Sequence, residues 1–113
     1  MAQYDVFETP IPALRRTFPF VVVLQSGLIE GGRDRVVPPL VPPLARAPSL
    51  AGRLAPIVRL DAHPDTPDAA SEHLVLVLGL TNLPAADLKR RAGNLAAHHD
   101  AIVNALDLLF HGY

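Results

Sequence analysis

The sequence ends in an apolar run, Ala105-Leu106-Asp107-Leu108-Leu109-Phe110-His111-Gly112-Tyr113. The run has the pattern of the last turns of an amphipathic helix, followed by a short tail with an aromatic ring. Most small domains end in a polar segment that frays. An apolar end must be buried in its own domain, in a second copy of the chain or in a partner. Which of these applies is the central question about function.

Helical spacing extends upstream from this run through Leu95, Ile102, Leu106 and Leu109. This apolar stripe predicts a helix from Leu95 onward, with Asn94 as an acceptable N-cap. Residues 84–94 are ambiguous. Their propensities favour a helix that starts at Pro84, whereas Gly93 next to Asn94 indicates a kink or a boundary.

Five segments before this helix have the pattern of β-strands, namely residues 3–7, 18–25, 35–37, 55–60 and 73–80. The second is nearly continuously apolar, which predicts a strand buried on both faces. Gly31-Gly32 indicates a hairpin turn and Thr81-Asn82 a further turn. The loops predicted by composition cover residues 8–16, 45–53 and 61–71. The pattern predicts one β-rich α+β domain over residues 1–113, a small barrel closed or plugged by the helix.

A quasi-repeat, Val37-Pro38-Pro39-Leu40-Val41-Pro42-Pro43-Leu44, lies in the middle of the chain. Paired prolines donate no ladder hydrogen bonds and favour polyproline II. The interpretation we favour is a stiff crossing segment whose valines and leucines pack on the domain's own core. The alternative is a ligand for an SH3-type partner.

Composition argues against several functional classes. The 10 basic and 11 acidic residues nearly cancel, unlike the basic balance of a dedicated nucleic-acid binder. The sequence has no cysteine, which excludes disulfides and cysteine nucleophiles and is consistent with the cytoplasm. We expect no signal peptide, because the N-terminus lacks a hydrophobic segment. We expect no membrane contact, because residues 74–80 are far shorter than the ~20 apolar residues of a span.

Two groups of polar residues were candidates for chemistry. His98-His99-Asp100 is typical of an acid–base or metal cluster, but adjacent helical residues point about 100° apart and do not chelate one ion. We interpret these residues as a solvated helix face. Ser26 with Asp5, Asp100 or a histidine is too loose a grouping to indicate a catalytic triad. We therefore expect no metal, no cofactor and no catalytic residue, and interpret the chain as an interaction protein.

Several segments share the pattern of one known family, namely Gln3-Tyr4-Asp5-Val6-Phe7, Val22-Val23-Leu24-Gln25-Ser26-Gly27-Leu28-Ile29, Arg33-Asp34-Arg35-Val36-Val37-Pro38-Pro39-Leu40, Leu54-Ala55-Pro56-Ile57-Val58 and the closing residues 102–113. The most specific element is a helix that ends in Phe-x-Gly-apolar, supported by Gln25-Ser26. On these segments the chain resembles the CcdB toxin family, the toxin half of a bacterial type II toxin–antitoxin pair.

This resemblance implies a mainly β, α+β fold. The barrel would be SH3-like and antiparallel, with a C-terminal α-helix, and the protein would be a homodimer. The resemblance also implies a last strand over residues 83–89 and a helix that begins near residues 95–97, against the helical propensity of that region.

The resemblance further implies a toxin that is not an enzyme and that binds the A subunit of DNA gyrase (a topoisomerase II), trapping it with cleaved DNA. A cognate antitoxin would neutralise it, and the toxin–antitoxin complex would repress its own operon by binding operator DNA. The target-binding residues implied are Tyr4, Ser26, Leu28, Ile29, Asn104, Asp107, His111, Gly112 and Tyr113.

Two tail positions depart from the best-studied family members, which carry tryptophan at the position of His111 and asparagine at that of Asp107. The two tryptophans of a dimer stack in the gyrase contact, whereas histidine offers less apolar area and is able to carry charge. The departures motivate one alternative, a CcdB-like regulator that has lost toxicity. Another is a MazF-type endoribonuclease on the same fold, which would need Arg33 or Arg35 with Ser26 at the scissile phosphate.

Overall fold

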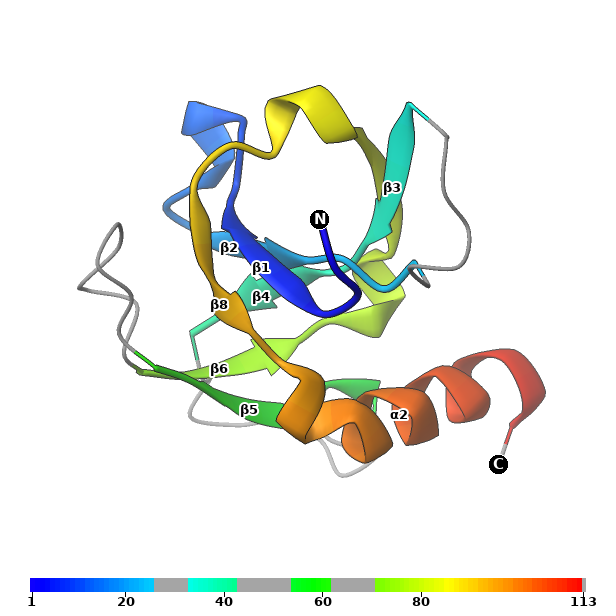
Figure 1. Ribbon diagram of the computed structural model, residues 1–113. Coiled ribbons are helices and arrows are strands. Elements are labelled where there is room, and N and C mark those ends of the chain that lie inside the picture. Colours follow the sequence, from blue (N-terminus) through cyan, green and yellow to red (C-terminus); the bar gives the residue numbers. More distant parts are fainter. Residues whose placement is uncertain (26–32, 43–53, 62–70, 113) are drawn as a thin grey trace.

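The computed structural model describes residues 1–25, 33–42, 54–61 and 71–112. In this part of the chain, eight strands precede one α-helix, α2 (His99–His111) (Figure 1). The strands are β1 (Asp5–Glu8), β2 (Phe20–Val22), β3 (Asp34–Val37), β4 (Pro39–Val41), β5 (Ile57–Leu60), β6 (Ser71–Val75), β7 (Thr81–Pro84) and β8 (Arg91–Asn94). Short 3₁₀ turns are η1 (Pro12–Leu14), η3 (Val77–Gly79), η4 (Ala85–Asp87) and η5 (Ala96–His98).

Six of the strands form one antiparallel sheet in the order β5-β6-β4-β2-β1-β8, and β3 pairs with β7. The large sheet curls into a half-barrel, and α2 lies below β5 and β6 in the view of Figure 1. The curl brings the edge strands β5 and β8 together. Gly93 of β8 lies so close to β5 that a Cβ on it would stand 3.0 Å from Leu60 Cδ1. The curled sheet and its terminal helix confirm the predicted mainly β, α+β fold.

The core lies on both faces of the curled sheet. Val22 of β2 belongs to the cluster that Ile102 and Ala105 of α2 help to form. Its neighbours Val21 and Val23 point to the opposite face, into a second cluster. The predicted burial of this strand on both faces is therefore confirmed, although β2 itself is shorter than the predicted 18–25.

The apolar stripe of the terminal helix is also confirmed. Leu95 and Ile102 are fully buried, and Leu106 and Leu109 pack against the same cluster. The helical region begins with η5 at Ala96, and α2 follows at His99, later than the predicted Leu95. The Oδ1 of Asn94 accepts a 2.8 Å hydrogen bond from the Ala96 N–H. The N-cap positions are Leu95 for η5 and His98 for α2, so the predicted N-cap role of Asn94 is wrong.

The prediction of a helix that starts at Pro84, which rested on residue propensities, is wrong. Residues 85–87 form only η4, and residues 91–94 form β8, which pairs with β1. The strand implied over 83–89 is likewise displaced, because β7 ends at Pro84 and the last strand is β8. Pairing with β1 satisfies the backbone of this region and outweighs its weak helical propensity.

Other boundaries shift by a few residues. The predicted strand 73–80 is β6 followed by η3, and β7 occupies residues 81–84 where we predicted a turn. The predicted strand 35–37 is β3, but its ladder partner is β7 rather than the preceding strand. The strand predicted over residues 3–7 is β1, which begins two residues later and ends one residue later. The loop predicted over residues 8–16 therefore begins one residue later than expected.

The proline repeat contributes a strand at the centre of the sheet. β4 lies between β2 and β6, and Leu40 and Val41 are buried. Although prolines donate no hydrogen bond, their carbonyls accept. Val22 N–H donates to Pro38 O at 3.2 Å, and Leu76 N–H donates to Pro39 O at 3.0 Å. The first copy of the repeat packs on the domain's own core, as predicted, although it does so in β-strands. Because its residues are buried in the sheet, they are not available as a ligand for an SH3-type partner.

Several predictions lie outside the described residues. They concern the Gly31-Gly32 turn, the loop over 45–53, nearly all of the loop over 61–71 and the end of the proline repeat.

Candidate functional site

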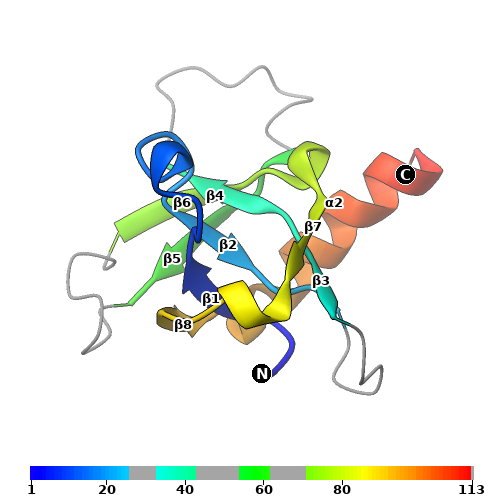
Figure 2. The same ribbon diagram turned by 90° about the horizontal axis from the view of Figure 1, so that it is seen from above.

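The exposed side of α2 carries three of the residues that the resemblance implied for target binding. Asn104, Asp107 and His111 are exposed and are spaced by three and four residues, which places them on one face of the helix. The opposite face, with Ile102 and Ala105, is buried. Figure 2 shows that the C-terminal half of α2 extends beyond the strands. The helix therefore presents a polar stripe at its projecting end.

A left-handed glycine ends the helix. Gly112 has φ +80°, and its N–H donates a 3.1 Å hydrogen bond to Leu108 O. Glycine adopts this conformation without the penalty that a Cβ imposes. The Phe-x-Gly motif is thus a helix stop, which sets the direction in which the chain leaves α2.

Apolar side chains remain exposed in the same region. Phe110 on α2 is 64% exposed, and Leu78 in η3, an element against which α2 packs, is 68% exposed. Leu106 and Leu109 are partly buried on the domain's own core. The apolar end is therefore only partly covered by its own domain, and Phe110 is available to another surface.

Four of the remaining candidates, Ser26, Leu28, Ile29 and Tyr113, lie outside the described residues. Tyr4 is only 6% exposed, and its ring belongs to the core cluster beneath α2. Its place in target binding stays a prediction, and its burial indicates a structural contribution.

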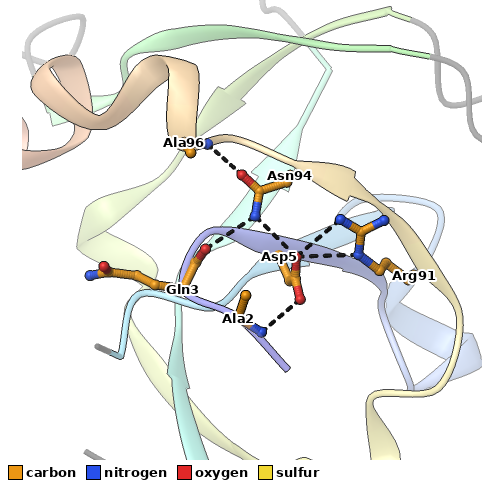
Figure 3. Close-up of polar contacts among 6 residues, drawn as sticks. All are labelled: Ala2, Gln3, Asp5, Arg91, Asn94 and Ala96. Carbon is orange, nitrogen blue, oxygen red and sulfur yellow. Dashed lines mark hydrogen bonds and ion pairs between the residues drawn. The ribbon is translucent and has the colours of Figure 1, made fainter. Parts of the chain in front are cut away.

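A polar network holds the beginning of the helical region (Figure 3). Asp5 Oδ1 accepts hydrogen bonds from Asn94 Nδ2 at 3.0 Å and from Arg91 Nε at 3.2 Å, and Asp5 Oδ2 accepts one from Ala2 N–H at 2.8 Å. Burial raises the pKa of Asp5, but the hydrogen bonds from Asn94, Ala2 and Arg91 and the charge of Arg91 outweigh it and lower the pKa. Asp5 is thus a structural carboxylate that holds Ala2, Arg91 and Asn94 together.

Two histidines contact the barrel where the chain enters α2. His99 and Asp100 are exposed, which confirms the solvated face for these two residues, whereas His98 is half-buried. His98 Nε2 accepts from Arg59 N–H at 3.2 Å. His99 Nδ1 shares a hydrogen bond with the Tyr4 hydroxyl, with the two rings edge to face and 5.4 Å apart. Burial, followed by the charge of Asp100, raises the pKa of Tyr4. Sequence reasoning missed these contacts because both partners are remote in sequence.

A metal centre finds no support in this geometry. Within the described ranges, no group of three or more histidines and carboxylates is placed to hold an ion. The arginine–serine pair of an endoribonuclease is untested, because Ser26 is outside those ranges. Arg35 Nη1 donates to Asp34 O at 2.9 Å.

A model of the CcdB protein family matches residues 3–112, nearly the whole chain. The chain belongs to the CcdB family. CcdB proteins are toxins of toxin–antitoxin systems that act as poisons rather than catalysts, and each is paired with an antitoxin. No curated protein matches the sequence. Among the described helices of this CcdB-family toxin, none combines the length and apolarity needed to cross a membrane.

This CcdB-family domain also has an apolar cavity of about 290 Å³ whose lining includes no residue of α2. It lies between the η1 loop, β4 and the segment from η3 to β7, and residues such as Leu14, Phe18 and Leu76 line it. Its lining has almost no polar surface, so it lacks the convergent polar groups that orient a specific small ligand.

Proposed function

We propose that this CcdB-family toxin binds the A subunit of DNA gyrase through the tail of α2 and traps the enzyme with cleaved DNA. The observation that carries the proposal is the projecting face formed by Asn104, Asp107 and His111, next to exposed Phe110. The toxin does not cleave or join any bond itself in this mechanism. It stabilises one state of gyrase by contact.

The physical basis is binding to a transient state. A protein that binds the cleaved complex more tightly than the resealed one shifts gyrase towards the cleaved complex by its difference in affinity. A rigid helix suits this role, because little conformational entropy is lost when it docks. Polar side chains on one face supply directional contacts.

A homodimer is part of the proposal. Phe110 and Leu78 are mostly exposed, and large apolar side chains of this kind are what an interface buries. A two-fold axis near this region would place two tails side by side and present both to one gyrase dimer. The cognate antitoxin would compete for the same projecting surface in the cytoplasm, and operator DNA would be contacted only through the toxin–antitoxin complex.

The direct test uses purified gyrase, supercoiled plasmid DNA and the full-length toxin. Linear DNA that appears only after protein digestion, and increases with toxin concentration, is the expected result. Its absence at micromolar toxin would remove gyrase as the target. Adding the antitoxin, taken as the product of the adjacent short reading frame, should reverse the effect.

A second candidate is a CcdB-like regulator without toxicity. It is favoured by His111, which offers less apolar contact area than the tryptophan of active relatives, and by the carboxylate of Asp107 on the same exposed face. Such a protein would bind an antitoxin and assist repression without forming a cleavage complex. Antitoxin binding together with a negative cleavage assay would favour this candidate.

A further inference from the structure

The two histidines at the start of α2 contact different parts of the barrel. His98 reaches the edge strand β5, through the backbone N–H of Arg59. His99 reaches the turn before β1, through the hydroxyl of Tyr4. β5 and β8 are the two edges of the curled sheet, and β1 lies beside β8. The two contacts therefore lie on either side of the line where these edges meet. His98 ends η5 and His99 begins α2, so the two neighbouring histidines lie where the chain enters the helix.

The His98 contact requires a particular protonation state. A backbone N–H is always a donor, so Nε2 of His98 has to be the unprotonated nitrogen. The neutral ring then carries its proton on Nδ1. This bond also satisfies an outward-facing N–H on an edge strand, a group that otherwise has no ladder partner.

The partner of His99 is rigidly held. Tyr4 N–H donates to Val23 O at 2.6 Å, and Tyr4 O accepts from Leu95 N–H at 2.9 Å. Tyr4 has φ +68°, a left-handed conformation that is unfavourable for a residue with a Cβ. Such a conformation persists only where the surroundings enforce it. Here it directs the buried ring towards the helix, with the hydroxyl at His99.

We propose that Tyr4, His98 and His99 are positioning residues that fix the direction of α2 and thereby aim the tail at its target. The aiming of the tail rests on the proposed function, whereas the fixing of the helix does not. The contacts act at the base of a 13-residue helix that is ~20 Å long. A tilt of about 10° at that base would move the far end by roughly 3 Å, enough to misplace a docked side chain.

The test compares substitutions that remove the hydrogen bonds with substitutions that retain them. His98→Leu and His99→Leu remove them. His98→Gln and His99→Asn keep an amide group near the position of Nε2 and of Nδ1, respectively. Tyr4→Phe removes the hydroxyl but keeps the ring. Ala101→Leu, at an exposed position one turn along α2, is the matched control for an added surface leucine.

Three measurements on the full chain report the effect. Hydrogen exchange gives the protection of α2 amides relative to those of β1 and β2. Spin labels on Lys89→Cys and Asp107→Cys give the distance from the barrel to the projecting helix, and the sequence has no other cysteine to label. The ¹⁵N shifts of the wild-type imidazoles give the tautomer of His98.

In the variant that combines His98→Leu with His99→Leu, we expect the hydrogen-exchange protection of α2 amides to fall about five- to tenfold, while that of β1 and β2 stays unchanged. The distribution of distances between the two spin labels should broaden. The Gln and Asn variants should restore both values, and His98 should carry its proton on Nδ1. A folded leucine variant with an unchanged distance distribution, or a uniform loss of protection, would overturn the proposal.

If the leucine variants do not fold, the proposal is tested by the tautomer of His98 in the wild type and by the spin-label distances in the Gln and Asn variants. A proton on Nε2 of His98, or broad distances in the Gln and Asn variants, would equally overturn it. None of these readouts involves gyrase. A negative cleavage assay, with the contacts of Tyr4, His98 and His99 shown to be intact, would therefore remove the proposed target and leave the positioning role standing.

Discussion

Asn94 Nδ2 donates a 3.0 Å hydrogen bond to Asp5 Oδ1 across the pairing of β8 with β1. The same amide group donates to Gln3 O at 3.1 Å and accepts from Ala96 N–H at 2.8 Å (Figure 3). One side chain thus connects the N-terminal turn, the last strand and the first helical turn. The orientation of the helical region therefore depends on a residue outside the projecting face.

Replacing this side chain should be costly. We expect Asn94→Ala to lower the free energy of unfolding by about 2 kcal/mol, because it removes the acceptor of the Ala96 N–H and leaves Asp5 with one fewer donor. Urea denaturation at pH 7 measures this. Asn104→Ala, at an exposed position on α2, should change stability by less than about 0.5 kcal/mol. Equal effects of the two substitutions would contradict the assigned role.

The carboxylate of Asp5 predicts a loss of stability in acid. Its pKa is lowered in the folded protein, because the hydrogen bonds from Asn94, Ala2 and Arg91 outweigh the effect of burial. The unfolded carboxyl titrates near pH ~4. The stabilisation is therefore complete above that pH and is lost as the pH falls from there through the folded pKa.

Asp5→Asn removes the titration and should flatten the stability curve in that window, although it lowers stability at pH 7. Urea midpoints between pH 5 and the acid limit of folding, measured for both proteins, give the two slopes. Identical slopes would show that Asp5 is not the group responsible. Asp107→Asn, at an exposed helix position, is the matched control and should leave the slope nearly unchanged.

Gly93 allows the two edges of the sheet to approach. It has φ +154°, and a Cβ there would lie 3.0 Å from Leu60 Cδ1. We expect Gly93→Ala to cost about 1–3 kcal/mol, from backbone strain and overpacking together. Thermal or urea unfolding measures the loss. Combining it with Leu60→Val, which removes the contacting methyl, should cost less than the sum of the two single changes, and strict additivity would contradict the steric account.

Local apolar patterning explains what the sequence predicted well. The run Val21-Val22-Val23 and the stripe from Leu95 to Leu109 depend only on neighbouring residues, and both were confirmed. The shared face of Asn104, Asp107 and His111 also follows from spacing alone. These features needed no knowledge of the rest of the fold.

Features that depend on remote partners were missed. β8 has helical propensity upstream, but its pairing with β1 decides its conformation. Pro39 takes part in a central strand because neighbouring strands supply the donors to proline carbonyls. The contacts of His98 with Arg59 and of His99 with Tyr4 were not predicted, because these partners are far away in sequence. Sequence patterns do not encode which distant donor meets which acceptor.

The exposure of Phe110 predicts that replacing it weakens dimerisation without destabilising the folded monomer. Phe110→Ser should change the free energy of monomer unfolding by less than about 0.5 kcal/mol, because the ring is 64% exposed. Ile102→Ala, at a fully buried position on the same helix, should cost about 2–4 kcal/mol. Sedimentation of Phe110→Ser should show weaker dimerisation at matched concentration. A dimer unaffected by this substitution would place the interface elsewhere.

The last prediction concerns His111, which lies on the same exposed face as Asp107. If the tail is the gyrase contact, His111→Trp adds apolar area where the contact is made and should tighten binding roughly tenfold. The concentration of toxin that gives half-maximal cleavage complex measures this. His111→Gln is the control, because it keeps a polar side chain and adds no aromatic area. No gain from tryptophan, with folding intact, would argue that the tail does not contact gyrase and would favour the regulator without toxicity.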